Sequence, residues 1–525
     1  MTLSRRDLLK AGVFATAATA LPLQRVVRAA SAYDSRMAAS KLPQPFTIPF
    51  ATPPVARPVR TDATTDYYSF TMTTALAELV PGYRTPLLSY QGSVPGPTVK
   101  VAQGRRVVAR HANLLPALHP TLKYEPWTSV HLHGSASLPQ YDGYASDITR
   151  PGQYKDYVYP NVQPARTLWY HDHGVHHTAE NAYHGLAAQY HLFDPNEQAL
   201  PIPHGEFDVP LVLSDAVFKA NGELLFTLED ESGLWGDVLL VNGRPWPVMK
   251  VKRRKYRFRV LDASISRSYR LSLDTGDPMW IIGTDGGLMP APQQVTSFRM
   301  LSGERYEVVI DFSKYRAGQR VVLKNTSPKN NRDYPNTDRI MAFDVIADSF
   351  GTADNAIPDV LDPVSSVMAL RESDAARTRT FRFHRTNGEW KVNDTTWKDI
   401  EESGYRKVSA DPRRGDTEIW EFQNNSGGWF HPVHVHLVDF RVLSRNGQAP
   451  FAHELGPKDV IYLGENETVR VLVKFEGVGR YMIHCHNLVH EDHDMMTQFE
   501  VLDPNGPGDD PMGTPARLLG QAPPL

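Results

Sequence analysis

Short runs of β-branched and aromatic residues follow one another closely from residue 45 onward, separated by clusters of Gly, Pro, Asn and Asp. Long stretches with helical periodicity are scarce. In residues 98–101, 256–260 and 418–422, polar residues alternate with apolar or aromatic ones, which is typical of half-buried strands. The 36 glycines and 41 prolines supply many turns without reaching the content of a low-complexity chain. This pattern predicts an all-β protein.

A faint internal repeat divides the chain. Turn-rich stretches recur at residues 94–97, 241–246 and 392–394, each associated with a predicted strand. A length of 525 residues fits three to four domains of about 150 residues each. The proline-rich stretch around residue 200 and a weakly patterned segment mark the breaks. We therefore predict three related β-sandwich modules at residues 45–200, 205–350 and 378–525, with a linker at 351–377.

The N-terminus has the features of a targeting segment. Arg5 and Arg6 precede a mildly apolar run at residues 11–20, which is too short to span a membrane as a mature helix. We interpret residues 1–32 as a twin-arginine signal peptide, cleaved somewhere from Ala20 to about Ala32, although an amphipathic helix is the alternative. No later stretch reaches about 18 apolar residues, so we expect an exported mature chain without a membrane span, in the periplasm, at the cell surface or secreted.

The net charge bears on the binding partners of the protein, and the cysteine content bears on how the chain is stabilised. The 56 basic and 59 acidic residues give a net charge of −3, which does not point to nucleic acid or an anionic membrane as a partner. Cys485 is the single cysteine, so no intrachain disulfide can form. The chain must therefore stabilise itself by burial, which its length allows.

Half of the 20 histidines fall into four tight clusters, at residues 131–133, 171–173, 431–436 and 484–490. Residues i and i+2 of a strand project on the same face, so each His-X-His presents two imidazoles to one metal centre. A single such pair is weak evidence, because it can arise by chance and zinc or nickel also accept imidazole. Four pairs supply eight candidate ligands: His131, His133, His171, His173, His434, His436, His484 and His486.

Cys485 lies between two histidines that share a strand face, so it must point to the opposite face and serve a different metal. A thiolate with two imidazoles and a weak axial thioether is the blue-copper ligand set. Cys485, His431, His490 and Met495 provide this set. The alternatives are an inert buried thiol at Cys485 and ordinary core packing at Met495.

Several redox metals held close together suit the reduction of dioxygen to water, because that reaction takes four electrons. A blue site can accept electrons singly from an outside donor. Residues 484–486 connect that site covalently to the histidine cluster. The constellation therefore predicts an oxidase.

The four histidine clusters, at residues 131–133, 171–173, 431–436 and 484–490, resemble in order and spacing the motifs of the multicopper oxidases. The resemblance extends over most of the chain from about residue 45. Within the family, stretches at residues 129–135, 167–173, 432–440 and 490–496 are similar to those of bilirubin oxidases. It implies three cupredoxin domains that hold four coppers: one type 1, one type 2 and a type 3 pair. The trinuclear cluster would then lie between the first and third domains, with dioxygen as the electron acceptor.

Carried over by motif, His131 and His434 resemble the type 2 ligands. Six further histidines resemble the type 3 ligands: His133, His171, His173, His436, His484 and His486. The second module shows no His-X-His where the repeat reaches residues 262–266, so it is expected to bear no copper.

Two acids next to ligands match family residues that deliver protons to reduced oxygen. These are Asp142, which could instead be only a turn residue, and Glu491, which could instead belong to a solvated acidic run.

Three functions compete at this point. The first is oxidation of small organic donors such as phenols, aromatic amines or bilirubin. The second is oxidation of cuprous or other metal ions in copper tolerance, which would usually show a methionine-rich segment, whereas the 13 methionines form no dense run. The third is a non-catalytic cupredoxin-fold protein that binds partners. We expect a monomer.

Overall fold

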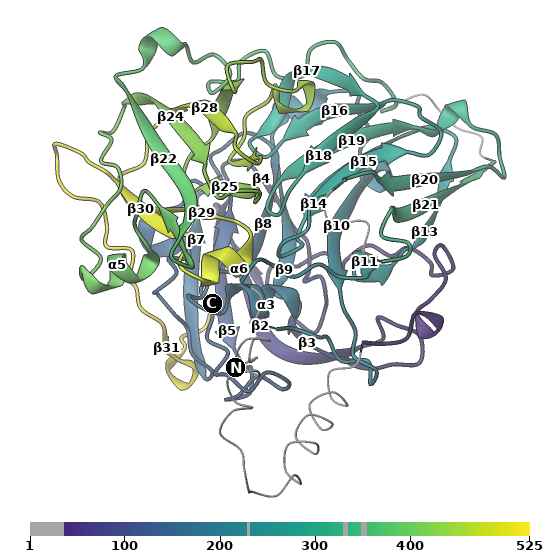
Figure 1. The fold of residues 1–525 in the computed structure, drawn as a ribbon, viewed down its shortest axis with the longest axis horizontal. Coiled ribbons are helices and arrows are strands. Elements are labelled where there is room, and N and C mark those ends of the chain that lie inside the picture. The colour runs from purple at the N-terminus through teal and green to yellow at the C-terminus, as the bar shows by residue number, and fades with distance from the viewer. Residues whose placement is uncertain (1–35, 228–230, 329–333, 348–353) are drawn as a thin grey trace, which may run out of the picture.

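The computed structural model describes residues 36–227, 231–328, 334–347 and 354–525. The predicted signal peptide at residues 1–32 lies outside the described residues. The described strands form six sheets, which share cores in pairs and so build three modules (Figure 1). The predicted all-β fold is therefore confirmed.

The first module has one sheet of six strands and one of four around a shared core rich in tyrosine. The six-stranded sheet contains β1 (Arg60–Thr61), β2 (Thr65–Ala77), β3 (Thr85–Tyr90), β5 (Arg106–Asn113), β7 (Gln153–Tyr159) and β31 (Arg517–Leu518). The four-stranded sheet contains β4 (Val99–Ala102), β9 (Ala187–Phe193), β8 (Arg166–Asp172) and β6 (Val130–His133). Strand β31 comes from the far end of the sequence and pairs with β7, so the tail of the chain joins the first module.

The second module has sheets of seven and five strands. The larger contains β12 (Arg244–Pro245), β11 (Val238–Val241), β10 (Asp208–Ala216), β14 (Lys255–Asp262), β19 (Arg305–Asp311), β16 (Met279–Thr284) and β17 (Gly287–Val295). The smaller contains β13 (Val248–Lys252), β21 (Arg339–Ile346), β20 (Arg320–Asn325), β15 (Tyr269–Leu273) and β18 (Ser297–Met300). Pro49 bridges to Val248, so the segment that precedes the first module lies along the second.

The third module has sheets of five and four strands. The larger contains β23 (Glu389–Val392), β22 (Arg377–Thr386), β24 (Thr417–Asn424), β28 (Thr468–Lys474) and β26 (Phe440–Arg445). The smaller contains β27 (Val460–Leu463), β25 (His431–Val435), β29 (Gly479–Cys485) and β30 (Met496–Val501).

A parallel strand pair recurs in every module. Strand β2 is parallel to β5, β10 to β14, and β22 to β24, whereas most neighbouring pairs are antiparallel. The recurrence gives the faint repeat in the sequence a structural counterpart.

The helices are short: α3 (Thr178–Tyr183), α4 (Pro195–Ala199), α5 (Trp397–Glu402) and α6 (Leu488–Asp492). Asn487 caps α6 by accepting from the Val489 N–H, and α6 lies beside α3 of the first module, as Figure 1 shows. Among the described residues, no helix has the length and apolar character needed to cross a membrane.

Candidate metal centre

Alternation along β25 and β29 sorts the candidate ligands onto two faces. Val433, Val435 and Cys485 belong to the core of the third module. His434 lies directly opposite His484, on the other face of the same sheet. The cysteine therefore points away from the flanking histidines, as the strand geometry requires.

Three side chains converge inside the third module. His431 Nδ1 lies 3.3 Å from Cys485 Sγ, His490 Nδ1 lies 3.6 Å from the same sulfur, and the two nitrogens are 3.3 Å apart. All three residues are fully buried. A thiolate and two imidazoles in such an arrangement suit a single copper ion.

Each imidazole of this site is oriented through its other nitrogen. His431 Nε2 lies 2.7 Å from Ser426 Oγ, and His490 Nε2–H donates to the Ser232 carbonyl at 3.0 Å. Such outer contacts fix the tautomer and leave the Nδ1 lone pairs facing the sulfur. Ser232 precedes the second module's strand β11, so that module also contributes to the site.

Met495 is fully buried in the same core cluster as Cys485, and its backbone carbonyl accepts from the Cys485 N–H at 3.0 Å. The structure thus brings the predicted axial residue to the same core as the cysteine.

Aromatic rings cover His490. Trp390 stacks on its imidazole with centroids 3.9 Å apart, and Trp429 meets it edge-on at 6.1 Å. Trp390 is buried, whereas Trp429 is half-buried next to the exposed residues Gly427 and Gly428. Sequence reasoning did not single out Trp390, because a lone tryptophan in a strand is typical of any core.

The eight remaining histidines lie where the first and third modules meet, and all are buried. In the first module, His131 of β6 pairs in register with His171 of β8. The core of that module takes the intervening residues Leu132 and Tyr170, so the histidines point out of it. Two strand pairs, one from each module, thus present their imidazoles to each other.

Contacts between ring nitrogens join one pair and one trio of the imidazoles, although rings of different groups also stack, as His133 does on His434 with centroids 3.7 Å apart. His131 Nε2 and His434 Nε2 lie 3.4 Å apart. The Nε2 atom of His484 lies 3.2 Å from that of His173 and 3.1 Å from that of His436.

The second trio is His133, His171 and His486, whose ring centroids are 5.1 to 5.8 Å apart. Each ring has one nitrogen held by a neighbour: His171 Nδ1–H donates to the Asp172 carbonyl at 2.8 Å, and His486 Nδ1 lies 3.1 Å from Ser302 Oγ. Among the described residues, the other nitrogens, His133 Nδ1, His171 Nε2 and His486 Nε2, have no hydrogen-bond partner.

These observations fit metal binding. Burial lowers the pKa of His171 to about 3 and that of His173 to about 4, so the rings are neutral, which is the form that binds metal. Buried polar atoms without partners are rare in folded proteins, and an ion would satisfy the three imidazole nitrogens. Burial also raises the pKa of the Cys485 thiol, and a bound cation would offset that cost by stabilising the thiolate.

Both predicted acids contact the histidines. The His436 Nδ1–H donates to Asp142 Oδ2 at 2.7 Å, and the Asp142 carbonyl accepts from His131 Nδ1–H at 2.5 Å. Burial raises the pKa of the Asp142 carboxyl well above its ordinary value. Glu491 Oε2 lies 2.8 Å from His484 Nδ1, and its Oε1 lies 3.6 Å from His173 Nδ1.

A third acid, Asp459, was missed by sequence reasoning. Its Oδ1 lies 3.1 Å from His133 Nε2, and its carbonyl accepts from His434 Nδ1–H at 2.9 Å. Arg305 of the second module binds both oxygens of the carboxylate at 2.6 Å. Burial raises the pKa of Asp459 to about 6, although Arg305 acts in the opposite direction. Asp459 stands in no histidine motif, so only the docking of modules reveals it.

Besides the Arg305 side chain, the second module also places the backbone of Gly303 against the histidine cluster. Gly303 has a φ of +88°, and a Cβ built there would lie 3.0 Å from His486 Cδ2 and 3.2 Å from His133 Cε1. Only a residue without a side chain fits there undisturbed. The described residues of this module belong to none of the metal-sized groups of His, Cys, Asp and Glu side chains.

Comparisons with known proteins place this geometry in a family. Three family models, each described as multicopper oxidase, match residues 71–196, 207–338 and 374–505. The chain is 42% identical over 484 residues to a bilirubin oxidase from Albifimbria verrucaria, covering 87% of this chain and 81% of that protein. It is 34% identical over 514 residues to a laccase from Bacillus subtilis, covering 86% and 98%.

Solved structures agree. A multi-copper oxidase from Pediococcus acidilactici superposes with a TM-score of 0.79 at 28% identity, covering 90% of this chain and 94% of that one. McoA from Aquifex aeolicus superposes with a TM-score of 0.73 at 28% identity, covering 86% and 100%. The three modules are cupredoxin-like domains, and the family implies copper as the cofactor. The resemblance seen in the motifs is confirmed: the chain belongs to the multicopper oxidase family and is an oxidoreductase that uses dioxygen.

Proposed function

We propose that this protein oxidises small organic donors, among them phenols, aromatic amines and bilirubin, and reduces dioxygen to water. The observation that carries the proposal is the covalent continuity of residues 484–486. Cys485 faces two imidazoles in the core of the third module, while the side chains before and after it join the histidine cluster. Electrons accepted beside Cys485 thus have a short covalent route to the site of dioxygen reduction.

Twelve residues would hold four coppers. Cys485, His431, His490 and Met495 would hold the first, and His131 with His434 the second. The trio of His173, His436 and His484 and the trio of His133, His171 and His486 would hold the remaining pair. Bound copper would take up electrons one at a time and supply four of them to dioxygen.

Asp142 and Glu491 take part in proton delivery in this proposal, Glu491 as a carboxylate, because burial is outweighed by the neighbouring His484 and His173, which lower its pKa to about 2. Burial raises the pKa of the Asp142 carboxyl well above its ordinary value, which favours the protonated form. Its Oδ1 has no hydrogen-bond partner among the described residues, which leaves that atom available to bind a water or a reduced oxygen species. Glu491 contacts the trio that contains His173 and His484. The two acids thus lie at different parts of the cluster.

Aromatic surface near His490 supports an organic donor. Trp429 is half-buried, meets the His490 ring edge-on and borders the exposed residues 427 and 428, so a planar donor can pack there. The 42% identity to a protein named bilirubin oxidase points in the same direction.

A side-by-side oxygen-uptake assay tests the proposal. The copper-loaded protein would be given bilirubin, a methoxyphenol and cuprous ion at matched concentrations. We expect faster uptake with the organic donors. Faster uptake with cuprous ion would overturn the donor assignment in favour of a metal-ion oxidase, and no uptake at full copper content would overturn the catalytic proposal.

A further inference from the structure

A tryptophan ring contacts both imidazoles of the cysteine site. The Trp390 indole stacks on His490 with centroids 3.9 Å apart, and it meets His431 edge-on with centroids 5.6 Å apart. Trp390 is fully buried, and its indole N–H donates to the Glu231 carbonyl at 3.1 Å. The ring therefore limits how both imidazoles can tilt, and a hydrogen bond to the second domain holds the ring.

A tight hairpin places an arginine beside this ring. Asn387 and Gly388 have φ values of +55° and +86°, as a two-residue turn between β22 and β23 requires. The turn fixes the register, in which Arg385 of β22 lies directly opposite Trp390 of β23. Directly opposite side chains share a face of the sheet, so the guanidinium carbon lies over the indole, 4.8 Å from its centroid.

Arg385 also joins the third domain to the second. Its Nη2 donates to the Glu231 carboxylate, and the carbonyl of the next residue, Ser232, accepts from His490 Nε2–H at 3.0 Å. Two consecutive residues of the second domain thus hold the guanidinium, the indole and the imidazole. These contacts form a clamp on His490, made of Arg385, Trp390, Glu231 and Ser232.

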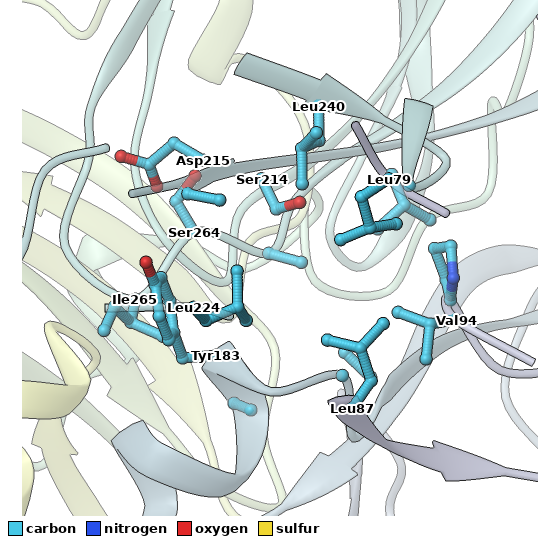
Figure 2. Close-up of a pocket in the computed structure, with 18 residues that line it drawn as sticks. Leu79, Leu87, Val94, Tyr183, Ser214, Asp215, Leu224, Leu240, Ser264 and Ile265 are labelled. Carbon is cyan, nitrogen blue, oxygen red and sulfur yellow. The ribbon is translucent and has the colours of Figure 1, made fainter. Parts of the chain in front are cut away.

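The clamp is anchored within the second domain. Farther along segment 231–236, the Leu234 N–H donates to Ser266 Oγ at 3.1 Å, and the Gly236 N–H donates to the Asp215 carboxylate. Asp215 lies at the edge of a small cavity of about 50 Å³ between the first and second domains, as Figure 2 shows. The segment is therefore fixed at one end and contacts the cysteine site at the other.

We propose that Arg385 is a positioning residue of the cysteine site: by clamping Trp390 against the second domain, it sets the orientation of the His490 imidazole. The proposal rests on the copper assignment made in the proposed function. Outer contacts of this kind orient a ligating imidazole and tune the metal. The charges of Arg385 and Glu231 offset each other at a partly exposed position, so the clamp acts mainly through geometry.

Two substitutions separate geometry from charge. Arg385→Met removes the cation, Glu231→Gln removes the anion, and each breaks the ion pair. A purely electrostatic effect would lower the reduction potential of the blue copper in the first variant and raise it in the second, with an unchanged electron paramagnetic resonance (EPR) spectrum. We expect instead that both variants change the copper hyperfine splitting and the Cu–S stretching bands in the same direction.

Copper release to a chelator gives a second measurement. In both variants, copper should leave the cysteine site about 10-fold faster than in the parent protein, the lower end of the effect typical for outer contacts of metal ligands. Release from the histidine cluster should stay unchanged.

Arg382→Met is the matched control. Arg382 is exposed on the same strand, and alternation directs it to the face opposite that of Arg385. Its EPR spectrum and copper release should match those of the parent protein.

Parent spectra in both clamp variants, or opposite shifts of the potential without a change in the EPR spectrum, would overturn the role of Arg385. A copper-loaded parent protein without a blue-copper EPR signal would instead overturn the copper assignment, and the clamp with it. The spectrum of the parent protein therefore distinguishes the two failures.

Discussion

The cysteine site and the histidine cluster are assembled in different ways. Every predicted ligand of the cysteine site comes from the third domain, on β25, β29, α6 and the loop before β30. The cluster takes two strands from the first domain and two from the third, and the second domain supplies Arg305, Ser302 and Gly303 around it. One domain therefore supplies all the ligands of the cysteine site, with only the Ser232 carbonyl of the second domain beside them, whereas the cluster draws its ligands from two domains and its support from the third.

Replacement of Cys485 should have the largest effect, because it removes the copper of one site and leaves that of the other. In Cys485→Ser, the blue absorption and the turnover of donors should both be lost, because the thiolate is gone. The cluster should keep its copper, since none of its eight imidazoles changes. Visible absorption, copper content and oxygen uptake measure the three outcomes, and a persistent blue colour would contradict the site assignment.

Asp142→Asn should affect only the cluster. The amide keeps the shape of the side chain but cannot hold an exchangeable acidic proton, so reoxidation by dioxygen should slow about 10²-fold to 10⁴-fold. Donors should still reduce the blue site at the parent rate. Stopped-flow absorption follows both steps.

Asp147→Asn is a useful comparison, because Asp147 is a nearby buried acid that pairs with Lys155 instead of a histidine. The folded variant should reoxidise normally, although loss of the partner of the buried Lys155 should lower its free energy of unfolding. If Asp142→Asn also reoxidised normally, Asp142 would not be a proton source.

Arg305→Met tests whether the second domain supports the cluster. Asp459 would lose its buried partner, while Asp285 would keep Lys458, and the unpaired Asp459 should lower the free energy of unfolding by about 3–5 kcal/mol. Copper should leave the cluster before the blue absorption fades during thermal unfolding.

Arg320→Met is the control within the same domain, since Arg320 pairs with Asp344 at the exposed surface and should cost about 0–1 kcal/mol. If the cluster copper and the blue absorption were lost at the same temperature in Arg305→Met, the two sites would unfold together, and the second domain would not support the cluster alone.

Two serines give the smallest and sharpest comparison. Ser426→Ala removes the contact to His431 Nε2, and Ser302→Ala removes the contact to His486 Nδ1. Loss of an outer contact of this kind typically costs about 10-fold to 100-fold in metal affinity. Copper release to a chelator should accelerate at the cysteine site alone in the first variant and at the cluster alone in the second. Equal acceleration of copper release at both sites in either variant would contradict the separate assembly of the cysteine site and the cluster.

Much of the fold and of the ligand arrangement could be predicted because it depends on local alternation. The opposite faces taken by Cys485 and His484 follow from adjacency in a strand, and the all-β architecture follows from short runs between turns. The division of imidazoles into a pair and two trios could not be worked out in this way. It depends on how β6 and β8 meet β25 and β29 across the domain interface.

The residues that sequence reasoning missed share one property. Asp459, Arg305 and Trp390 act through partners distant in the sequence, and none stands in a repeated motif. Buried charges such as Arg305 look like ordinary surface residues until their partners are known. Long-range electrostatic pairs of this kind become visible only once the domains are placed together.

Gly303 limits how this protein can be rebuilt. It belongs to the one domain that is predicted to hold no copper, and a Cβ added there would meet the rings of His486 and His133. A chimaera that takes its second domain from another oxidase would therefore need a glycine at this position, even though that domain contributes no ligand. The three repeats share one outline, but the middle domain cannot be exchanged freely, because its backbone at Gly303 must fit against the imidazoles of the other two domains.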